Sequence, residues 1–154
     1  MLLIGIGNSG RSDDGLGWMM LDHIKKKSYP LDLLYRYQLQ VEDADLISHY
    51  QFVIFVDATK EPTENGFYFR PCQPGNEVGL TSHMLHPGTV LWIDNELYNH
   101  QPTTFVMGIE GKKWGLSLKP SPSGLTNLKK AKKFLTDHIE KRLQLKKTLG
   151  SQRN

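Results

Sequence analysis

Two short apolar runs stand out in the first half of the chain. Residues 1–6 (MLLIGI) and 52–56 (FVIFV) contain only hydrophobic side chains and glycine, and polar segments follow both runs. Unbroken runs of this length are typical of strands that are covered on both faces, whereas a half-exposed strand alternates. We therefore expect both runs to be buried strands of one sheet.

The segment 31–41 has a different pattern, with apolar side chains at every second position and mostly polar residues between them. This alternation predicts a half-exposed strand near a sheet edge. Residues 67–70 are expected to form a brief edge strand, because Pro71 has no backbone N–H to donate and limits its length. The last predicted strand covers residues 103–109.

Apolar positions three or four residues apart predict the helices. Pro87 and Gly88 interrupt the third of them, and residues 120–124 are expected to form a loop before the fourth. Strands that alternate with helices indicate an α/β fold with a largely parallel sheet. The predicted helices cover residues 15–27, 42–50, 83–98 and 126–145.

The length of 154 residues suits one compact domain, which we expect to span residues 1–149 and to leave 150–154 as a disordered tail. The net charge of +3 is unevenly distributed, because residues 119–154 hold ten basic and two acidic side chains. Residues 1–118 hold nine basic and fourteen acidic side chains. An acidic body is not typical of a nucleic-acid-binding domain, so no nucleic-acid partner is expected.

Membrane insertion is not expected, because no apolar run approaches the roughly 20 residues that cross a bilayer. The first residues also lack the pattern of a signal peptide, which favours a soluble, cytoplasmic protein, and we expect a monomer. The single cysteine, Cys72, excludes an internal disulfide and a cysteine-rich metal site. Its place in an irregular segment favours a structural or incidental thiol over a nucleophile.

Three residues with metal-binding chemistry follow the predicted strands. Asp14 comes after the first strand, Asp57 directly follows the apolar run 52–56, and His83 lies beyond the edge strand. Sites in open parallel sheets form at the carboxyl ends of the strands, and two carboxylates with an imidazole suit a divalent metal such as nickel or zinc. The spacing alone leaves another interpretation open, in which Asp13 and Asp14 are acids at a helix N-terminus and His83 is an ordinary loop residue.

The sequence also contains G-x-G-x-x-G, formed by Gly5, Gly7 and Gly10 between the first strand and the first helix. This pattern occurs in dinucleotide-binding sites. However, Asp13 and Asp14 stand where a pyrophosphate would approach the helix, and their charge disfavours it. The histidines other than His83 are expected to be solvated, with His86 the second choice as a ligand. They are His23, His49, His86, His100 and His138.

Several segments follow a pattern that one family of proteases shares. A G-x-G-N turn, an acidic pair and a G-x-G entry into the first helix occur in order, and a later apolar strand ends in Asp-Ala. The segments are residues 4–8 (IGIGN), 11–17 (RSDDGLG) and 53–58 (VIFVDA), followed by Ser82-His83. In these segments the chain resembles the hydrogenase maturation endopeptidases, which remove a C-terminal extension from the precursor of the nickel–iron hydrogenase large subunit.

The resemblance implies a site and a fold. In the family, the residues at the positions of Asp14, Asp57 and His83 form a metal-binding site that engages nickel already inserted in the precursor. It therefore implies that these three residues are catalytic and bind the metal, that the precursor is the partner and that it supplies the nickel. Zinc is a possible substitute in vitro. The implied fold is a three-layer αβα sandwich around a twisted sheet of about five strands, and the implied reaction is metal-assisted peptide hydrolysis.

Two alternatives remain open at the level of sequence. Peptidyl-tRNA hydrolases share the turn found at residues 5–10, but they need a histidine-containing segment soon after it, where residues 11–17 offer acids instead. The second alternative is a nickel-dependent chaperone or docking protein of the same fold that binds a precursor without cutting it. Cleavage of a nickel-loaded precursor distinguishes the protease from both.

Overall fold

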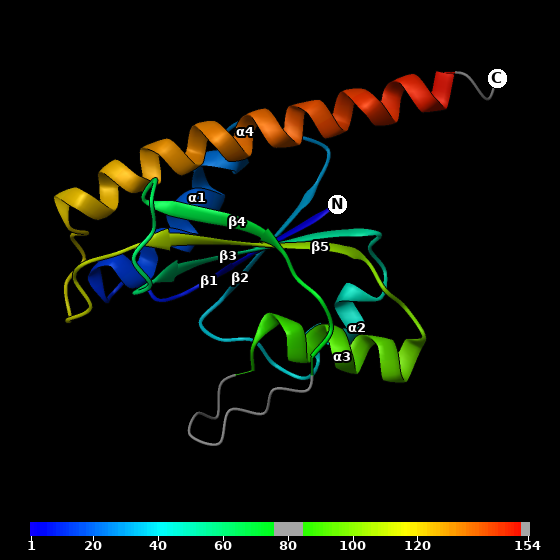
Figure 1. The fold of residues 1–154 in the computed structure, drawn as a ribbon, viewed down its shortest axis with the longest axis horizontal. Coiled ribbons are helices and arrows are strands. Elements are labelled where there is room, and N and C mark those ends of the chain that lie inside the picture. The colour runs from blue at the N-terminus through cyan, green and yellow to red at the C-terminus, as the bar shows by residue number, and fades with distance from the viewer. Residues whose placement is uncertain (76–84, 152–154) are drawn as a thin grey trace.

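A five-stranded sheet forms the centre of the protein, whose computed structural model describes residues 1–75 and 85–151 (Figure 1). The strands are β1 (Leu2–Ile6), β2 (Asp32–Arg36), β3 (Phe52–Thr59), β4 (Phe67–Pro71) and β5 (Thr103–Glu110). They lie in the order β2-β1-β3-β5-β4, in which only β4 is antiparallel to its neighbour. The predicted α/β fold with a mostly parallel sheet is confirmed.

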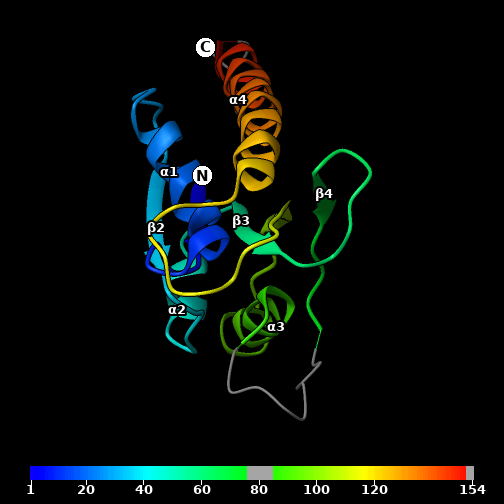
Figure 2. The same ribbon diagram turned by 90° about the vertical axis from the view of Figure 1, so that its left-hand side faces the viewer.

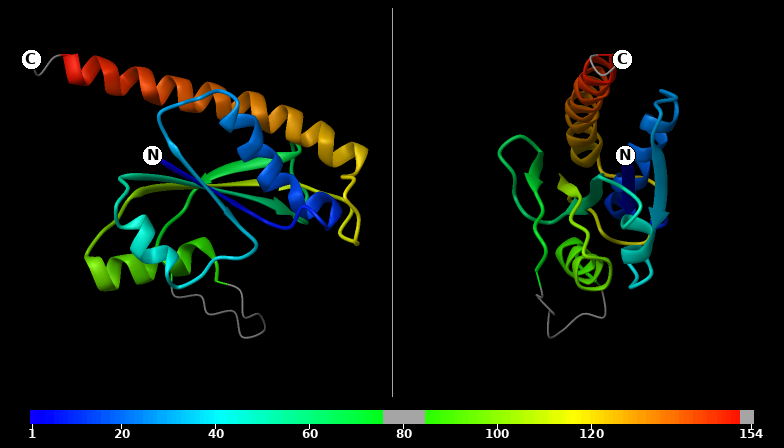
Figure 3. Two further views of the ribbon diagram at one scale, coloured as in Figure 1. Left: turned by 180° about the vertical axis from the view of Figure 1, so that it is seen from behind. Right: turned by 90° about the vertical axis from the view of Figure 1, so that its right-hand side faces the viewer.

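Helices cover both faces of the sheet. They are η1 (Ser12–Gly15), a 3-10 helix, and α1 (Leu16–Lys25), α2 (Asp43–Ile47), α3 (Pro87–Tyr98) and α4 (Pro122–Ser151). Helices α1 and α4 lie on one face and α2 and α3 on the other, which gives the three layers of an αβα sandwich (Figure 2). The views from behind and from the opposite side show the same separation (Figure 3).

The two predicted apolar runs are buried strands, because each face of the sheet carries its own core. In β3, Phe52, Ile54 and Val56 pack against α1 and α4. Val53 and Phe55 project to the other side, toward α2 and α3. A central strand with both faces covered needs apolar residues at every position, which explains why this segment shows no alternation.

Strand β2 lies at the sheet edge as predicted, but it ends at Arg36 rather than at residue 41. The buried carboxylate of Asp43 accepts hydrogen bonds from Nε of Arg36 and from the N–H of Gln40, both at 2.9 Å. These bonds turn the chain, and Leu39 becomes part of the core under α2 and α3. The alternation of apolar and polar residues therefore continues past Arg36, because the turn buries the side chain of Leu39.

Helices α3 and α4 both begin at a proline, which differs from the prediction for each. Pro87 does not interrupt α3 but opens it, since its fixed φ and missing N–H suit the first helical position. In the same way, residues 120–124 are not all loop, because α4 begins at Pro122. Ser121 caps α4 by accepting the N–H of Gly124 on its Oγ at 2.9 Å.

Helix α4 is 30 residues long and runs well past the end of the sheet (Figure 1). It includes residues 150 and 151, which were expected to begin a disordered tail, and residues 152–154 lie outside the described part. No proline occurs after Pro122 to end the helix earlier. Within residues 1–75 and 85–151, no helix has both the length and the apolar character to cross a membrane.

Candidate active site

Asp57 lies inside β3 rather than after it, because the strand continues to Thr59. It pairs in register with Gly108 of β5, on the face that α2 and α3 cover. Its half-buried carboxylate accepts a hydrogen bond from the N–H of Ala58 at 2.7 Å. Burial raises the pKa of Asp57 to about 7; the bond from Ala58 opposes this shift, and the negative charge of Asp14 adds to it.

Asp14 is half-buried and belongs to η1, which packs against β3. Gly17 allows this approach, since a Cβ there would lie 2.5 Å from the carbonyl oxygen of Ile6 and 2.6 Å from that of Val56. The start of α1 therefore packs against the backbone of Val56, the residue before Asp57. The structure thus brings Asp14 and Asp57 together at the edge formed by the carboxyl ends of the parallel strands, as their positions after these strands predicted.

Asp13, the other member of the acidic pair, has a different place. Its side chain is completely buried and ties η1 to the loop of residues 111–121. The carboxylate accepts bonds from the N–H groups of Lys112 (2.6 Å), Lys113 (2.9 Å) and Ser121 (2.6 Å) and from the hydroxyl of Ser121 (2.7 Å). Burial alone would raise the pKa of Asp13, but these hydrogen bonds outweigh it and lower the pKa below its usual value.

The loop of residues 111–121 lies beside the turn between β1 and η1, as Figure 2 shows. Ser12 donates its backbone N–H to the carbonyl of Ser117 at 2.6 Å, and Ser117 donates its own to Gly10 at 3.0 Å. Ser12 adopts φ 52°, a left-handed conformation that is uncommon outside glycine. The segment that carries Asp14 is therefore held from both sides, by the sheet and by this loop.

His83, the third predicted ligand, lies outside the described residues. His86, the second choice, is exposed and stands at the N-cap of α3, beside a cavity of about 620 Å³. This cavity lies between β4 and α3, and Tyr68 and Arg70 line it as well. In residues 1–75 and 85–151, no three His, Cys, Asp or Glu side chains are placed to hold a metal ion. Of the three predicted metal ligands, the described residues therefore include Asp14 and Asp57.

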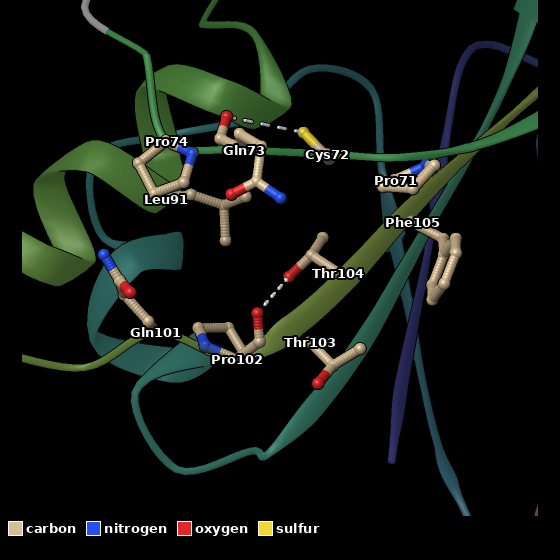
Figure 4. Close-up of a pocket in the computed structure, with 10 residues that line it drawn as sticks. All are labelled: Pro71, Cys72, Gln73, Pro74, Leu91, Gln101, Pro102, Thr103, Thr104 and Phe105. Carbon is tan, nitrogen blue, oxygen red and sulfur yellow. Dashed lines mark hydrogen bonds between the residues drawn. The ribbon is translucent and has the colours of Figure 1, made fainter.

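Cys72 follows β4 and lines a smaller cavity of about 240 Å³ between β5 and α3 (Figure 4). Its Sγ points to the carbonyl oxygen of Gln73 at 3.9 Å. Burial raises the pKa of the Cys72 thiol, which keeps it protonated at neutral pH and makes it a poor nucleophile. The structure therefore agrees with the assignment of this residue as a structural thiol.

Three histidines that were expected to be solvated have partners inside the protein. The Nδ1 of His100 lies 2.7 Å from the carboxylate of Asp94, which is fully buried on α3. His138 packs among phenylalanines of β3, β4, β5 and α4, and His23 contacts the hydroxyl of Thr136 at 3.2 Å. The partners of His23 and His138, apart from Phe134, lie far along the chain, and Asp94 and His100 meet across the end of α3. Local spacing therefore indicated only the contact between Phe134 and His138. Because His100 precedes β5, its pair with Asp94 lies at the sheet edge opposite Asp57.

The comparisons with known proteins concern the fold of the chain. No protein-family model matches the chain, and no curated protein matches it. Solved structures of hydrogenase maturation proteases do match it over almost its whole length. The chain therefore has the fold of the hydrogenase maturation proteases, as the sequence resemblance implied.

Three of these structures show the extent of the likeness. HycI, a [NiFe] hydrogenase maturation protease from Thermococcus kodakarensis, superposes with a TM-score of 0.70 at 21% identity, over 90% of this chain and 91% of its own. The hydrogenase maturating endopeptidase HybD from E. coli gives 0.70 at 15% identity, with 92% of each chain covered. The hydrogenase 2 maturation peptidase from a Thaumarchaeota archaeon gives 0.65 at 17%, covering 90% and 96%.

Proposed function

We propose that the protein is an endopeptidase that removes the C-terminal extension of a nickel–iron hydrogenase large-subunit precursor after nickel insertion. The observation that carries this proposal is Asp57, a carboxylate on a central strand whose burial raises its pKa to about 7. It stands at the sheet edge where Asp14 also lies, in a fold that proteases of this activity share. Perturbed carboxylates of this kind are typical of active sites.

The proposed reaction is hydrolysis of a peptide bond. A water oxygen bonds to the carbonyl carbon, the bond from that carbon to nitrogen breaks, and a proton passes to the leaving amine. Asp57 is placed to accept the proton of the water on the carboxylate oxygen that does not ligate the metal. A base of this kind contributes about 100-fold to 10,000-fold to the rate.

The nickel of the precursor belongs to the substrate in this proposal. Asp14 and Asp57 would ligate it together with His83, and carboxylates with imidazole form a donor set that nickel accepts. The metal would polarise the scissile carbonyl group. Recognition of nickel would also restrict cleavage to precursors in which insertion is complete.

The test is incubation of the purified chain with nickel-loaded and nickel-free precursor, followed by mass spectrometry of the released peptide. We expect cleavage of the loaded precursor alone. Cleavage of both forms would overturn the role of nickel, and cleavage of neither would overturn the protease assignment. Stable binding of the loaded precursor without any cleavage would identify the non-cleaving docking protein instead.

A further inference from the structure

Tyr68 stands in the same row of the sheet as Asp57. Asp57 of β3 pairs with Gly108 of β5, and Gly108 pairs in turn with Tyr68 of β4. Residues directly opposite each other on neighbouring strands project to the same face of a sheet. Asp57 and Tyr68 therefore flank a glycine on one face, two strand spacings or about 10 Å apart at their Cα atoms.

Gly108 leaves the space that the ring of Tyr68 fills. A Cβ on Gly108 would lie 2.3 Å from Cζ of Tyr68 and 2.6 Å from its hydroxyl oxygen, distances that real atoms cannot occupy. The far end of the tyrosine ring thus lies over β5 instead of pointing away from the sheet. Its hydroxyl is thereby brought to the strand next to Asp57.

The ring of Tyr68 is also held from its own strand. The guanidinium carbon of Arg70 lies 4.0 Å from the centre of the ring, which is a close cation–π contact. Tyr68 and Arg70 both line the cavity of about 620 Å³ between β4 and α3. Tyr68 therefore borders this cavity, and its hydroxyl lies over Gly108, the residue that pairs with Asp57.

A tyrosine hydroxyl in this position is a hydrogen-bond donor. Phenols ordinarily lose their proton near pH 10, and burial raises the pKa of Tyr68 further, so the hydroxyl keeps its proton at neutral pH. Peptide hydrolysis places negative charge on the carbonyl oxygen when water adds to the carbon. A donor aimed at that oxygen stabilises the transition state more than the bound substrate.

We infer that Tyr68 is a further catalytic residue, whose hydroxyl donates a hydrogen bond to the carbonyl oxygen of the scissile peptide bond while Asp57 acts on its other side. This inference rests on the proposed function. Gly108 is a positioning residue in it, because any side chain there would displace the tyrosine ring. Arg70 supports the ring through its cation–π contact.

The variant Tyr68→Phe tests the inference, since it removes the hydroxyl and keeps the ring over Gly108. With nickel-loaded precursor we expect kcat to fall about 100-fold while KM changes little, because the donor acts in the transition state. The matched control is Tyr50→Phe, which removes a hydroxyl bonded to Asp32 at the opposite edge of the sheet, and it should keep the activity of the wild type. Gly108→Ala should lower kcat although the hydroxyl is retained.

The outcomes separate this inference from the proposed function. A wild-type chain that cleaves no precursor overturns the proposed function and, with it, the role of Tyr68. A wild-type chain that cleaves while Tyr68→Phe has an equal kcat overturns only the inference. A rise in KM at unchanged kcat also overturns it, because the hydroxyl would then contribute to binding alone. Urea unfolding of each variant shows that a lower kcat does not reflect a smaller folded fraction.

Discussion

Asp13, which is completely buried, and Asp57, which is half-buried, have opposite surroundings. Asp13 accepts four hydrogen bonds, three of them from backbone N–H groups of the 111–121 loop, and its pKa is lowered. Asp57 accepts a bond from the N–H of Ala58, its single partner among the described residues, and burial raises its pKa to about 7. The anionic form of the aspartate side chain is thus stabilised at Asp13 and destabilised at Asp57.

This difference separates a structural carboxylate from a candidate catalytic one. A carboxylate surrounded by donors is fixed in position and has no free lone pair to offer a substrate. A carboxylate that is buried with few donors has unused capacity to accept a proton or to ligate a metal. The comparison therefore assigns stability to Asp13 and chemistry to Asp57, and each assignment can be tested separately.

The largest effect is expected for Asp57→Asn. The amide keeps the shape of the side chain but cannot act as a base or as an anionic ligand, so we expect cleavage of nickel-loaded precursor to fall at least about 100-fold. The fold should persist, because the change removes an unfavourable buried charge. Peptide release by mass spectrometry and urea unfolding measure the two quantities on the same sample.

The matched control for this variant is Asp22→Asn, which neutralises an exposed aspartate on α1. It should cleave at the rate of the wild type. Cleavage by Asp57→Asn at the same rate as this control would remove Asp57 from the site. Loss of the folded state in Asp57→Asn would contradict the contrast with Asp13.

The next effect is a loss of stability in Asp13→Ala. Three backbone N–H groups lose their acceptor, and the one of Ser121 is buried, where an unsatisfied group costs about 1–3 kcal/mol. We expect the free energy of unfolding to fall by about 3 kcal/mol or more in urea titrations. An unchanged urea midpoint would show that water replaces the carboxylate and that the hydrogen bonds of Asp13 do not stabilise the fold.

The sequence predicts the sheet well because its strongest signals arise from burial on the strands themselves. The apolar runs before Gly7 and Asp57 mark β1 and β3, and parallel strands bring their carboxyl ends to one edge. This is why Asp14 and Asp57 could be placed together before the structure was known. The bounds of α3 and α4 were missed because a proline opens a helix as readily as it interrupts one.

The pattern of residues alone does not distinguish Asp13 from Asp14, and only the family resemblance selected Asp14 as the ligand. The two residues are adjacent and chemically identical, and the donors that bind Asp13 lie 99 to 108 residues later in the chain. No local spacing connects a carboxylate with N–H groups so far away. The role of Tyr68 was hidden for the same reason, since it depends on the register of β4 against β5.

The pH dependence of stability should differ between the two aspartates. Asp57 has a folded pKa of about 7 and an unfolded value near 3.9, so the wild type loses stability as the pH rises from about 4 to 7. Asp57→Asn removes this loss. Its advantage in the free energy of unfolding over the wild type should grow by up to about 1.4 kcal/mol per pH unit in this range.

Asp13 should give the opposite sign. Its folded pKa is lowered, so its stabilising contribution is present above the unfolded pKa near 3.9 and is lost as the pH falls through the folded value. The difference in stability between the wild type and Asp13→Asn should therefore shrink below about pH 4. Urea titrations at several pH values measure both variants, and parallel profiles would contradict the comparison.

The smallest effect is expected for Ser121→Ala, which removes one of the four hydrogen bonds to Asp13. The Ser121 hydroxyl donates to Asp13 and also caps α4 by accepting the N–H of Gly124. Its loss should lower the free energy of unfolding by about 1 kcal/mol, the usual cost of an N-cap, while the three backbone donors to Asp13 remain.

Ser123→Ala is the matched control for this variant, because Ser123 contacts the Ser121 hydroxyl at 3.1 Å but does not bond to Asp13. It should change stability by less than Ser121→Ala. Both variants should keep the cleavage rate per folded molecule, since neither serine side chain is bonded to Asp14 or Asp57. A loss of cleavage in Ser121→Ala at unchanged stability would mean that the hydrogen bonds of Asp13 also position the neighbouring Asp14. Asp13 and Asp57 would then both contribute to one site.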